Sequence, residues 1–220
     1  QMTEEGSNTL ASDFAYGTKY CRRPNALEVD PVSLGLKKLD DVLGKRLLPA
    51  NNLALFGGIR DAAPDSWGRR VIESKLKVPA NSLPETQYLL HAGSDRVGAL
   101  DIRLSIHDGP SHGPNVSRNL DHLLEAADRI EEGLPVPAHL EAIFVDGTGL
   151  GGARPKATVR DDTGMLWLAK FSSRKDTFDV PGIECASLRL AEKAGLRVPA
   201  LQIRHIGDRK VMLIQRFDRY

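Results

Sequence analysis

The chain has 220 residues, of which 41% are hydrophobic, and its 30 Lys and Arg residues nearly balance its 29 Asp and Glu residues. This length provides a buried core in one large or two small domains, and the near-neutral charge excludes a strongly basic nucleic-acid binder and an acidic disordered tail. Cys21 and Cys185 form no zinc-ligand spacing, and no apolar run is long enough to span a membrane. We expect a globular cytoplasmic protein with reduced thiols and no membrane segment.

The N-terminal residues show little regular patterning. Residues 1–12 lack an apolar period, which is typical of a frayed segment or a cut end. Residues 13–31 mix aromatic side chains with a Pro-Asn pair and predict short strands and turns. Residues 34–48 place leucines and a valine at helical spacing up to Pro49, which predicts one helix.

A stronger helical pattern covers residues 61–76, with Asp61 as the expected N-cap and Pro64 in the first turn. Residues 97–106 alternate between apolar and polar side chains, as a strand does. Residues 108–119 are rich in Gly, Pro, Ser and Asn, which favours a linker. This linker divides the chain into two predicted units, at residues 1–108 and 119–220.

The second half begins with an amphipathic helix over residues 120–130. Residues 184–194 predict a second helix, and its inner side would carry Ala186, Leu190, Ala191 and Ala194. Strands are predicted at residues 142–145, 157–159, 165–171, 201–206 and 211–217. The pattern therefore predicts an α+β fold, with an antiparallel sheet in the second unit.

A glycine loop separates the first two of these strands, and Gly147, Gly149 and Gly152 fit the spacing G-x-G-x-x-G. Glycines allow a backbone to approach phosphate closely. A dinucleotide-binding fold requires a helix directly after the loop, but Ala157-Thr158-Val159 favours a strand, which argues against an oxidoreductase of that class. Protein kinases use a glycine loop between antiparallel strands, with a lysine on the following strand.

Lys170 lies on the predicted strand after this loop, and Glu184 opens the following helix. The order of loop, lysine and helix carboxylate favours a nucleotide site in which Glu184 pairs with Lys170. Three simpler interpretations stay open. Lys170 would be a surface lysine, Glu184 a first-turn acid favoured by the helix dipole, and the loop a flexible hairpin.

Several motifs together resemble the HipA family, serine/threonine protein kinases that act as toxins of bacterial toxin–antitoxin modules. The motifs span nearly the whole chain in the family's order. They are Phe14-Ala15-Tyr16-Gly17, Ala63-Pro64-Asp65-Ser66-Trp67-Gly68-Arg69-Arg70, Val97-Gly98-Ala99-Leu100, Gly149-Leu150-Gly151-Gly152-Ala153-Arg154-Pro155-Lys156, Leu168-Ala169-Lys170-Phe171, Glu184-Cys185-Ala186-Ser187 and Gln215-Arg216-Phe217-Asp218. The resemblance implies a mixed N-terminal subdomain packed on a kinase-like small lobe.

The resemblance also implies roles for individual residues. Lys170 would contact the phosphates of ATP, supported by Glu184. The phosphate-covering loop would be Gly151, Gly152, Ala153, Arg154, Pro155 and Lys156, and the adenine hinge would be Gln215, Arg216 and Phe217. The implied partner is a small DNA-binding antitoxin (HipB-like), through which DNA is contacted only indirectly. The implied substrates are proteins such as aminoacyl-tRNA synthetases.

The chain departs from the family pattern at two places. Many members carry a regulatory Ser in the glycine loop, where this chain has Gly149 with Thr148 beside it. The chain also ends at Tyr220, directly after the hinge, with no catalytic Asp or Mg²⁺ ligands downstream. We therefore expect these residues to bind ATP but to be inactive alone, with the Mg²⁺ ligands beyond residue 220. The alternative is a non-catalytic module that binds an antitoxin or another chain.

Overall fold

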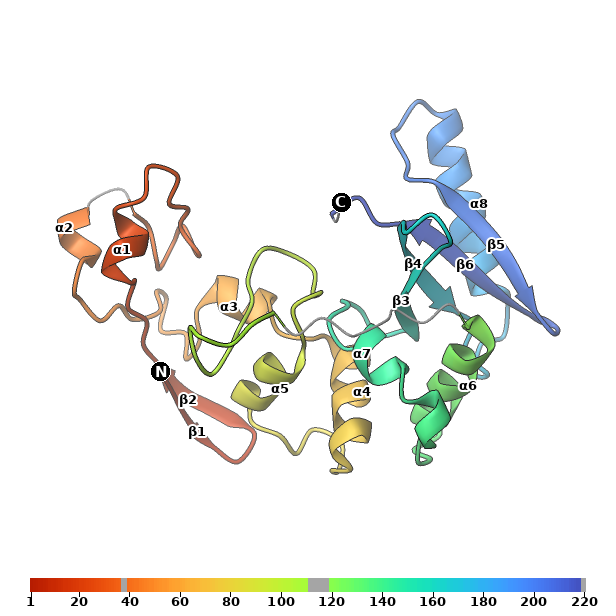
Figure 1. Cartoon of the computed structure of the whole chain (residues 1–220), viewed down its shortest axis with the longest axis horizontal. Coiled ribbons are helices and arrows are strands. Elements are labelled where there is room, and N and C mark those ends of the chain that lie inside the picture. Colours follow the sequence, from red (N-terminus) through yellow and green to blue (C-terminus); the bar gives the residue numbers. More distant parts are fainter. Residues whose placement is uncertain (37–38, 111–118, 219–220) are drawn as a thin grey trace.

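The computed structural model describes residues 1–36, 39–110 and 119–218, and it has the α+β architecture that the sequence predicts. In chain order the elements are β1 (Met2–Glu5), β2 (Asn8–Ser12), α1 (Thr18–Cys21), α2 (Leu39–Val42), α3 (Gly57–Asp61), α4 (Ser66–Leu76), α5 (Glu85–His91), α6 (Leu120–Glu131), η1 (Ala138–Leu140), α7 (Ile143–Asp146), β3 (Lys156–Arg160), β4 (Leu166–Phe171), α8 (Val180–Lys193), β5 (Leu201–Ile206) and β6 (Arg209–Gln215). Figure 1 shows the β1–β2 hairpin and helices α1–α3 on one side of α4 and the larger sheet on the other. In the described part of the chain, no helix combines the length and the apolar character needed to cross a membrane.

Strands β1 and β2 form an antiparallel hairpin, so the prediction of a frayed segment over residues 1–12 is wrong. Gly6 takes a left-handed backbone conformation in the turn (φ +57°), which a residue without a Cβ adopts at low cost. The backbone N–H of Thr86 donates to the Glu4 carboxylate (3.1 Å) and ties the hairpin to α5. Nearly all residues of both strands are exposed or half-buried, which explains why the sequence shows no apolar period there.

Residues 34–48, predicted as one helix, contain only the single-turn helix α2 among the described residues. Leu34 precedes α2, is fully buried, and accepts a hydrogen bond from the Tyr16 hydroxyl at its carbonyl (2.6 Å). Gly44 takes φ +70°, a conformation that interrupts a helix. The apolar spacing instead serves a small core, whose buried members are Tyr16, Cys21, Leu34, Val42 and Phe56.

Two other stretches predicted as strands form no ladder. Residues 97–106 adopt bends and turns, and Leu104 and Ile106 are 85% and 93% exposed. Alternation alone does not make a strand, because the backbone groups also need a neighbouring strand to bond to. Further upstream, where short strands were predicted, a single bridge between Phe14 and Leu47 is followed by helix α1.

Helix α4 begins at Ser66, with Asp65 rather than Asp61 at the N-cap position. Pro64 separates it from α3, because a proline disfavours helical geometry in the residue before it and lacks a backbone donor. The side chains of Trp67, Val71 and Ile72 on one face of this helix are fully buried.

The second half builds a four-stranded antiparallel sheet in the order β3-β4-β6-β5, which confirms the predicted strands with small shifts at their ends. Lys156 on β3 lies opposite Lys170 on β4, so both side chains are on one face of the sheet. The other face carries Ala157, Ala169 and Leu213, which belong to the main hydrophobic core. The core residues that face the sheet from the helices include Trp67, Val71, Leu123, Leu124, Ala127, Leu140 and Ile143.

The main core joins parts of both predicted units. Trp67 and Val71 of α4 lie within residues 1–108, yet they pack with the sheet and with α6, the helix predicted over residues 120–130. Most of the predicted linker, residues 111–118, lies outside the described residues. The division into units at 1–108 and 119–220 therefore stays a prediction.

The segment predicted as a strand at residues 142–145 is instead the short helix α7. Ile143 is fully buried, and its carbonyl accepts a hydrogen bond from the backbone N–H of Gly147 (2.9 Å), which closes the helical turn. α7 packs against α4 and β3, so the apolar run fills the core instead of extending the sheet. The glycine loop consequently joins a helix to a strand.

Helix α8 contacts β5 and β6 and begins at Val180, earlier than predicted. Asp179 caps it by accepting a hydrogen bond from the backbone N–H of Gly182 (3.0 Å). The predicted inner side is wrong: Pro181 and Cys185 are buried, whereas Ala186, Leu190 and Ala194 are exposed. In Figure 1 the C-terminal part of α8 extends past the sheet.

Candidate functional site

A cavity of about 240 Å³ lies between the end of the glycine loop, strands β3 and β4, and the start of α8. Seven of the residues that the sequence predicts for the nucleotide site line it: Gly151, Gly152, Ala153, Arg154, Lys156, Lys170 and Glu184. Pro155 belongs to the same loop but does not line the cavity, and its carbonyl accepts a hydrogen bond from the backbone N–H of Phe171 (3.0 Å). The fold thus brings the predicted loop, strand lysine and helix carboxylate together.

Lys170 and Glu184 form the ion pair that the sequence predicts, between the lysine Nζ and the glutamate Oε1. The lysine is on β4, on the cavity face of the sheet, and the glutamate is near the start of α8. Their side chains are 27% and 37% exposed, so the pair remains open to a ligand from solvent. The contact is present, and its role in ligand binding stays a prediction.

Lys156 lies beside this pair and is only 6% exposed. Burial lowers the pKa of its ammonium group to about 8, and the neighbouring charge of Lys170 acts in the same direction. The carboxylates of Asp65 and Glu184 act in the opposite direction. Within the described residues, the Lys156 ammonium makes no hydrogen bond or ion pair, so an anion in the cavity would supply the counter-charge that it lacks.

The start of helix α4 holds the loop in place through Gly152. The backbone N–H of Gly152 donates to Oδ2 of Asp65 (2.6 Å), and its carbonyl accepts from the backbone N–H of Trp67 (3.1 Å). The Trp67 indole also donates to the Lys156 carbonyl (2.8 Å). The sequence does not single out Asp65 as a site residue, because no local pattern signals a contact between residues 87 positions apart.

Arg154 is held at the outer end of the loop by Asp176, a contact that no sequence pattern indicates. One guanidinium nitrogen of Arg154 donates to both carboxylate oxygens of Asp176 (2.8 and 2.9 Å). Asp176 also accepts a hydrogen bond from the backbone N–H of Ser173 (3.0 Å). The charge of Arg154 is thereby balanced, which leaves the two lysines as the principal positive groups of the cavity.

The first two glycines of the G-x-G-x-x-G motif pack closely against other parts of the backbone. A Cβ on Gly149 would lie 2.7 Å from the Cα of Arg96, and one on Gly147 would lie 2.9 Å from the carbonyl oxygen of Ile143. Only Gly152 of the three borders the cavity, and its φ of +93° favours glycine. At Gly147 and Gly149 the loop backbone lies close to other backbone segments of the same protein rather than to a ligand position.

Residues 148–220 match the family model of the HipA-like C-terminal domain. The resemblance to the HipA family that the sequence predicts is confirmed for these residues. They include the four-stranded sheet, α8 and every residue listed above as lining the cavity. A search of curated proteins finds no match to the chain.

Thr148 is the first residue of the segment that matches the HipA-like C-terminal domain, and it stands beside Gly149. Its side chain is 3% exposed, and its hydroxyl donates to the carbonyl of Ala92 (3.3 Å). The hydroxyl is therefore enclosed by the protein and does not face the cavity.

The residues expected to form the adenine hinge of the HipA-like domain do not line the cavity. Gln215 ends β6, and Phe217 is 77% exposed. Arg216 is buried, and one of its guanidinium nitrogens donates to the Thr158 hydroxyl (3.2 Å). Thr158 follows Lys156 on the same face of β3, about 7 Å further along at the usual strand rise. Arg216 therefore borders the continuation of the cavity face, and the hinge role stays a prediction.

Proposed function

We propose that this chain is the ATP-binding part of a HipA-like serine/threonine protein kinase, and that the cavity receives the phosphates of ATP. The observation that carries the proposal is the Lys170–Glu184 pair, which stands beside the loop that contains Gly152. In protein kinases, a strand lysine paired with a helix glutamate contacts the nucleotide phosphates under a glycine-rich loop. The family match covers the same residues and supports the same class of activity.

The charges of the cavity fit a polyphosphate. The ammonium groups of Lys156 and Lys170 face one carboxylate at the cavity wall, that of Glu184. ATP, when bound, supplies the phosphoryl group, and the residues of this chain bind and orient its phosphates. Among the described residues, no group of three or more His, Cys, Asp or Glu side chains is placed to hold a metal ion.

The relationship to HipA proteins supports two further parts of the proposal. The acceptor would be a hydroxyl group of a protein, such as an aminoacyl-tRNA synthetase, in the cytoplasm. The partner would be a small DNA-binding antitoxin, so that contact with DNA is indirect.

Nucleotide binding by the chain itself tests the proposal. Titration of the wild-type protein with Mg-ATP in a calorimeter should give saturable binding, and Lys170→Ala should weaken it by about tenfold or more, the value of a lost charge-assisted hydrogen bond. Lys175→Ala is the matched control, because Lys175 is an exposed lysine in the loop after β4 and does not line the cavity. Equal affinities in wild type and Lys170→Ala, or no binding to either, would refute the proposal.

A non-catalytic binding module is the second candidate, and the outer side of α8 is the observation that favours it. Ile183 and Leu190 are 54% and 65% exposed on that helix, and Leu196 just after it is 64% exposed. Apolar side chains grouped in this way are typical of surfaces that other protein segments cover. Tight binding of a protein partner without saturable ATP binding would support this alternative.

A further inference from the structure

We infer that Asp65 competes with ligand phosphate for the loop: its carboxylate accepts the hydrogen bond of the Gly152 N–H group, and its negative charge repels a phosphate bound beside it. This inference rests on the proposed function of the cavity. It identifies a residue outside the HipA-like domain that sets the affinity of the site.

The carboxylate lies directly against the two glycines of the loop. Oδ2 of Asp65 accepts the hydrogen bond from Gly152 at 2.6 Å, and it is 3.1 Å from the position that a Cβ on Gly151 would take. Both glycines line the cavity. Glycine loops of nucleotide sites bind phosphate oxygens through their backbone N–H groups. Here the carboxylate oxygen of Asp65 takes that position at Gly152.

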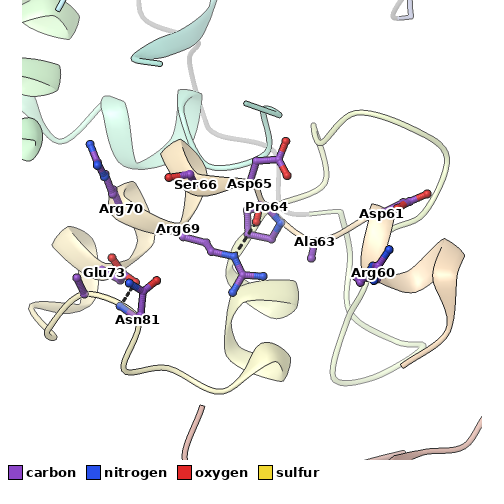
Figure 2. Close-up of a pocket in the computed structure, with 11 residues that line it drawn as sticks. Arg60, Asp61, Ala63, Pro64, Asp65, Ser66, Arg69, Arg70, Glu73 and Asn81 are labelled. Atoms are coloured by element: carbon purple, nitrogen blue, oxygen red, sulfur yellow. Dashed lines mark hydrogen bonds between the residues drawn. The ribbon is translucent and has the colours of Figure 1, made fainter. Parts of the chain in front are cut away.

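The carboxylate of Asp65 points toward the loop and not toward the nearby arginines. Asp65 also borders a separate cavity of about 730 Å³ that contains Arg60 and Arg69. Figure 2 shows the Asp65 side chain pointing away from both arginines. The guanidinium of Arg69 is instead occupied by the Pro64 carbonyl (3.0 Å) and by the Glu85 carboxylate.

The hydrogen bond to Gly152 is not a by-product of helix capping. Asp65 occupies the N-cap position of α4, but its side chain makes no hydrogen bond to that helix. The loop has a second attachment, because the backbone N–H of Trp67 donates to the Gly152 carbonyl. Removing the charge of Asp65 therefore leaves the loop tied to α4.

The size of the effect follows from Coulomb's law. The Asp65 carboxylate already acts electrostatically on the Lys156 ammonium across the cavity wall, so it also acts on a phosphate bound there. At an effective dielectric constant of about 40, two like charges about 6 Å apart repel enough to change affinity roughly tenfold. Each added phosphate charge near the loop increases the repulsion.

The experiment compares the binding of Mg-ATP and of inorganic tripolyphosphate to wild type, Asp65→Asn and Asp61→Asn by calorimetry. Asn is isosteric and can still accept the Gly152 hydrogen bond, so Asp65→Asn removes only the charge. We expect it to bind both ligands about five to ten times more tightly than wild type. Asp61→Asn should stay within twofold, because Asp61 is exposed and makes no hydrogen bond to the loop in the described structure.

The possible results separate this inference from the proposed function. Unchanged or weaker binding in Asp65→Asn, with Mg-ATP binding still dependent on Lys170, would overturn the competition and leave the nucleotide site intact. Tighter tripolyphosphate binding in Asp65→Asn, with no added affinity from the adenosine part of ATP, would support the competition and refute the nucleotide site. Asp65→Ala, which also removes the hydrogen bond, provides a second variant and should again bind tripolyphosphate more tightly than wild type.

Discussion

Replacing Lys156 with Met should stabilise the folded protein at neutral pH and remove part of its pH dependence. The pKa of this lysine falls from 10.5 in the unfolded chain to about 8 in the folded protein. At about 1.4 kcal/mol for each pKa unit, the charged form of Lys156 costs the fold about 3 kcal/mol at pH 7. Met keeps the apolar length of the side chain without the charge, so Lys156→Met should recover most of this free energy.

The sign of the pH dependence follows from proton binding. Between pH 8 and 10.5 the unfolded chain holds a proton on Lys156 that the folded protein has released, so the free energy of unfolding rises with pH in this window. The advantage of Lys156→Met should therefore be largest at pH 7 and nearly absent at pH 10.5. Urea unfolding, followed by the fluorescence of the buried Trp67 and Trp167, measures it at pH 7, 8.5 and 10.

The comparison between variants isolates Lys156 from the other groups that titrate in alkali. Lys175→Met is the control, because Lys175 is exposed and should leave the free energy of unfolding unchanged at each pH. Parallel pH profiles for wild type and Lys156→Met would refute the reasoning. They would mean that the lysine is charged in the folded protein without a penalty.

Two further substitutions test how the site is supported. Gly149→Ala should lower the free energy of unfolding by about 1–3 kcal/mol, because the new Cβ would meet the backbone of Arg96, whereas Gly17→Ala, in open space, should change it by less than about 0.5 kcal/mol. Equal urea midpoints for these two variants would contradict this assignment of Gly149. Asp179→Ala should lower the free energy of unfolding by about 1 kcal/mol through loss of the α8 N-cap. Asp208→Ala is the control at an exposed position. Equal thermal-unfolding midpoints for wild type and both variants would contradict this prediction.

The local spacing of apolar and charged residues predicted the structure correctly where an element and its partners are close in sequence. The lysine at position 170 and the glutamate at position 184 lie on a strand and a helix that follow each other directly, and their contact was predicted correctly. The helix over residues 120–130 was also predicted correctly, because its apolar face meets a single continuous core. In these segments the sequence pattern and the burial pattern agree.

Periodicity failed where burial depended on distant segments. The apolar run at residues 142–145 is a helix because α4 and β3 together enclose Ile143. The residues predicted to be buried on α8 include Ala186 and Leu190, which are exposed, because the buried side of the helix carries Pro181 and Cys185 instead. A sequence window does not contain such distant neighbours, so it cannot assign the face that is covered.

The sequence by itself determined the α+β class, the four strands of the sheet, the lysines at positions 156 and 170 and the pairing of Lys170 with Glu184. Only the tertiary structure decided that Gly149 packs against Arg96 and that Asp65 holds Gly152. The physical reason is the range of the interactions. Backbone conformation and side-chain alternation are set by neighbours along the chain, whereas a close backbone approach or a carboxylate at a loop N–H depends on where a remote helix is packed.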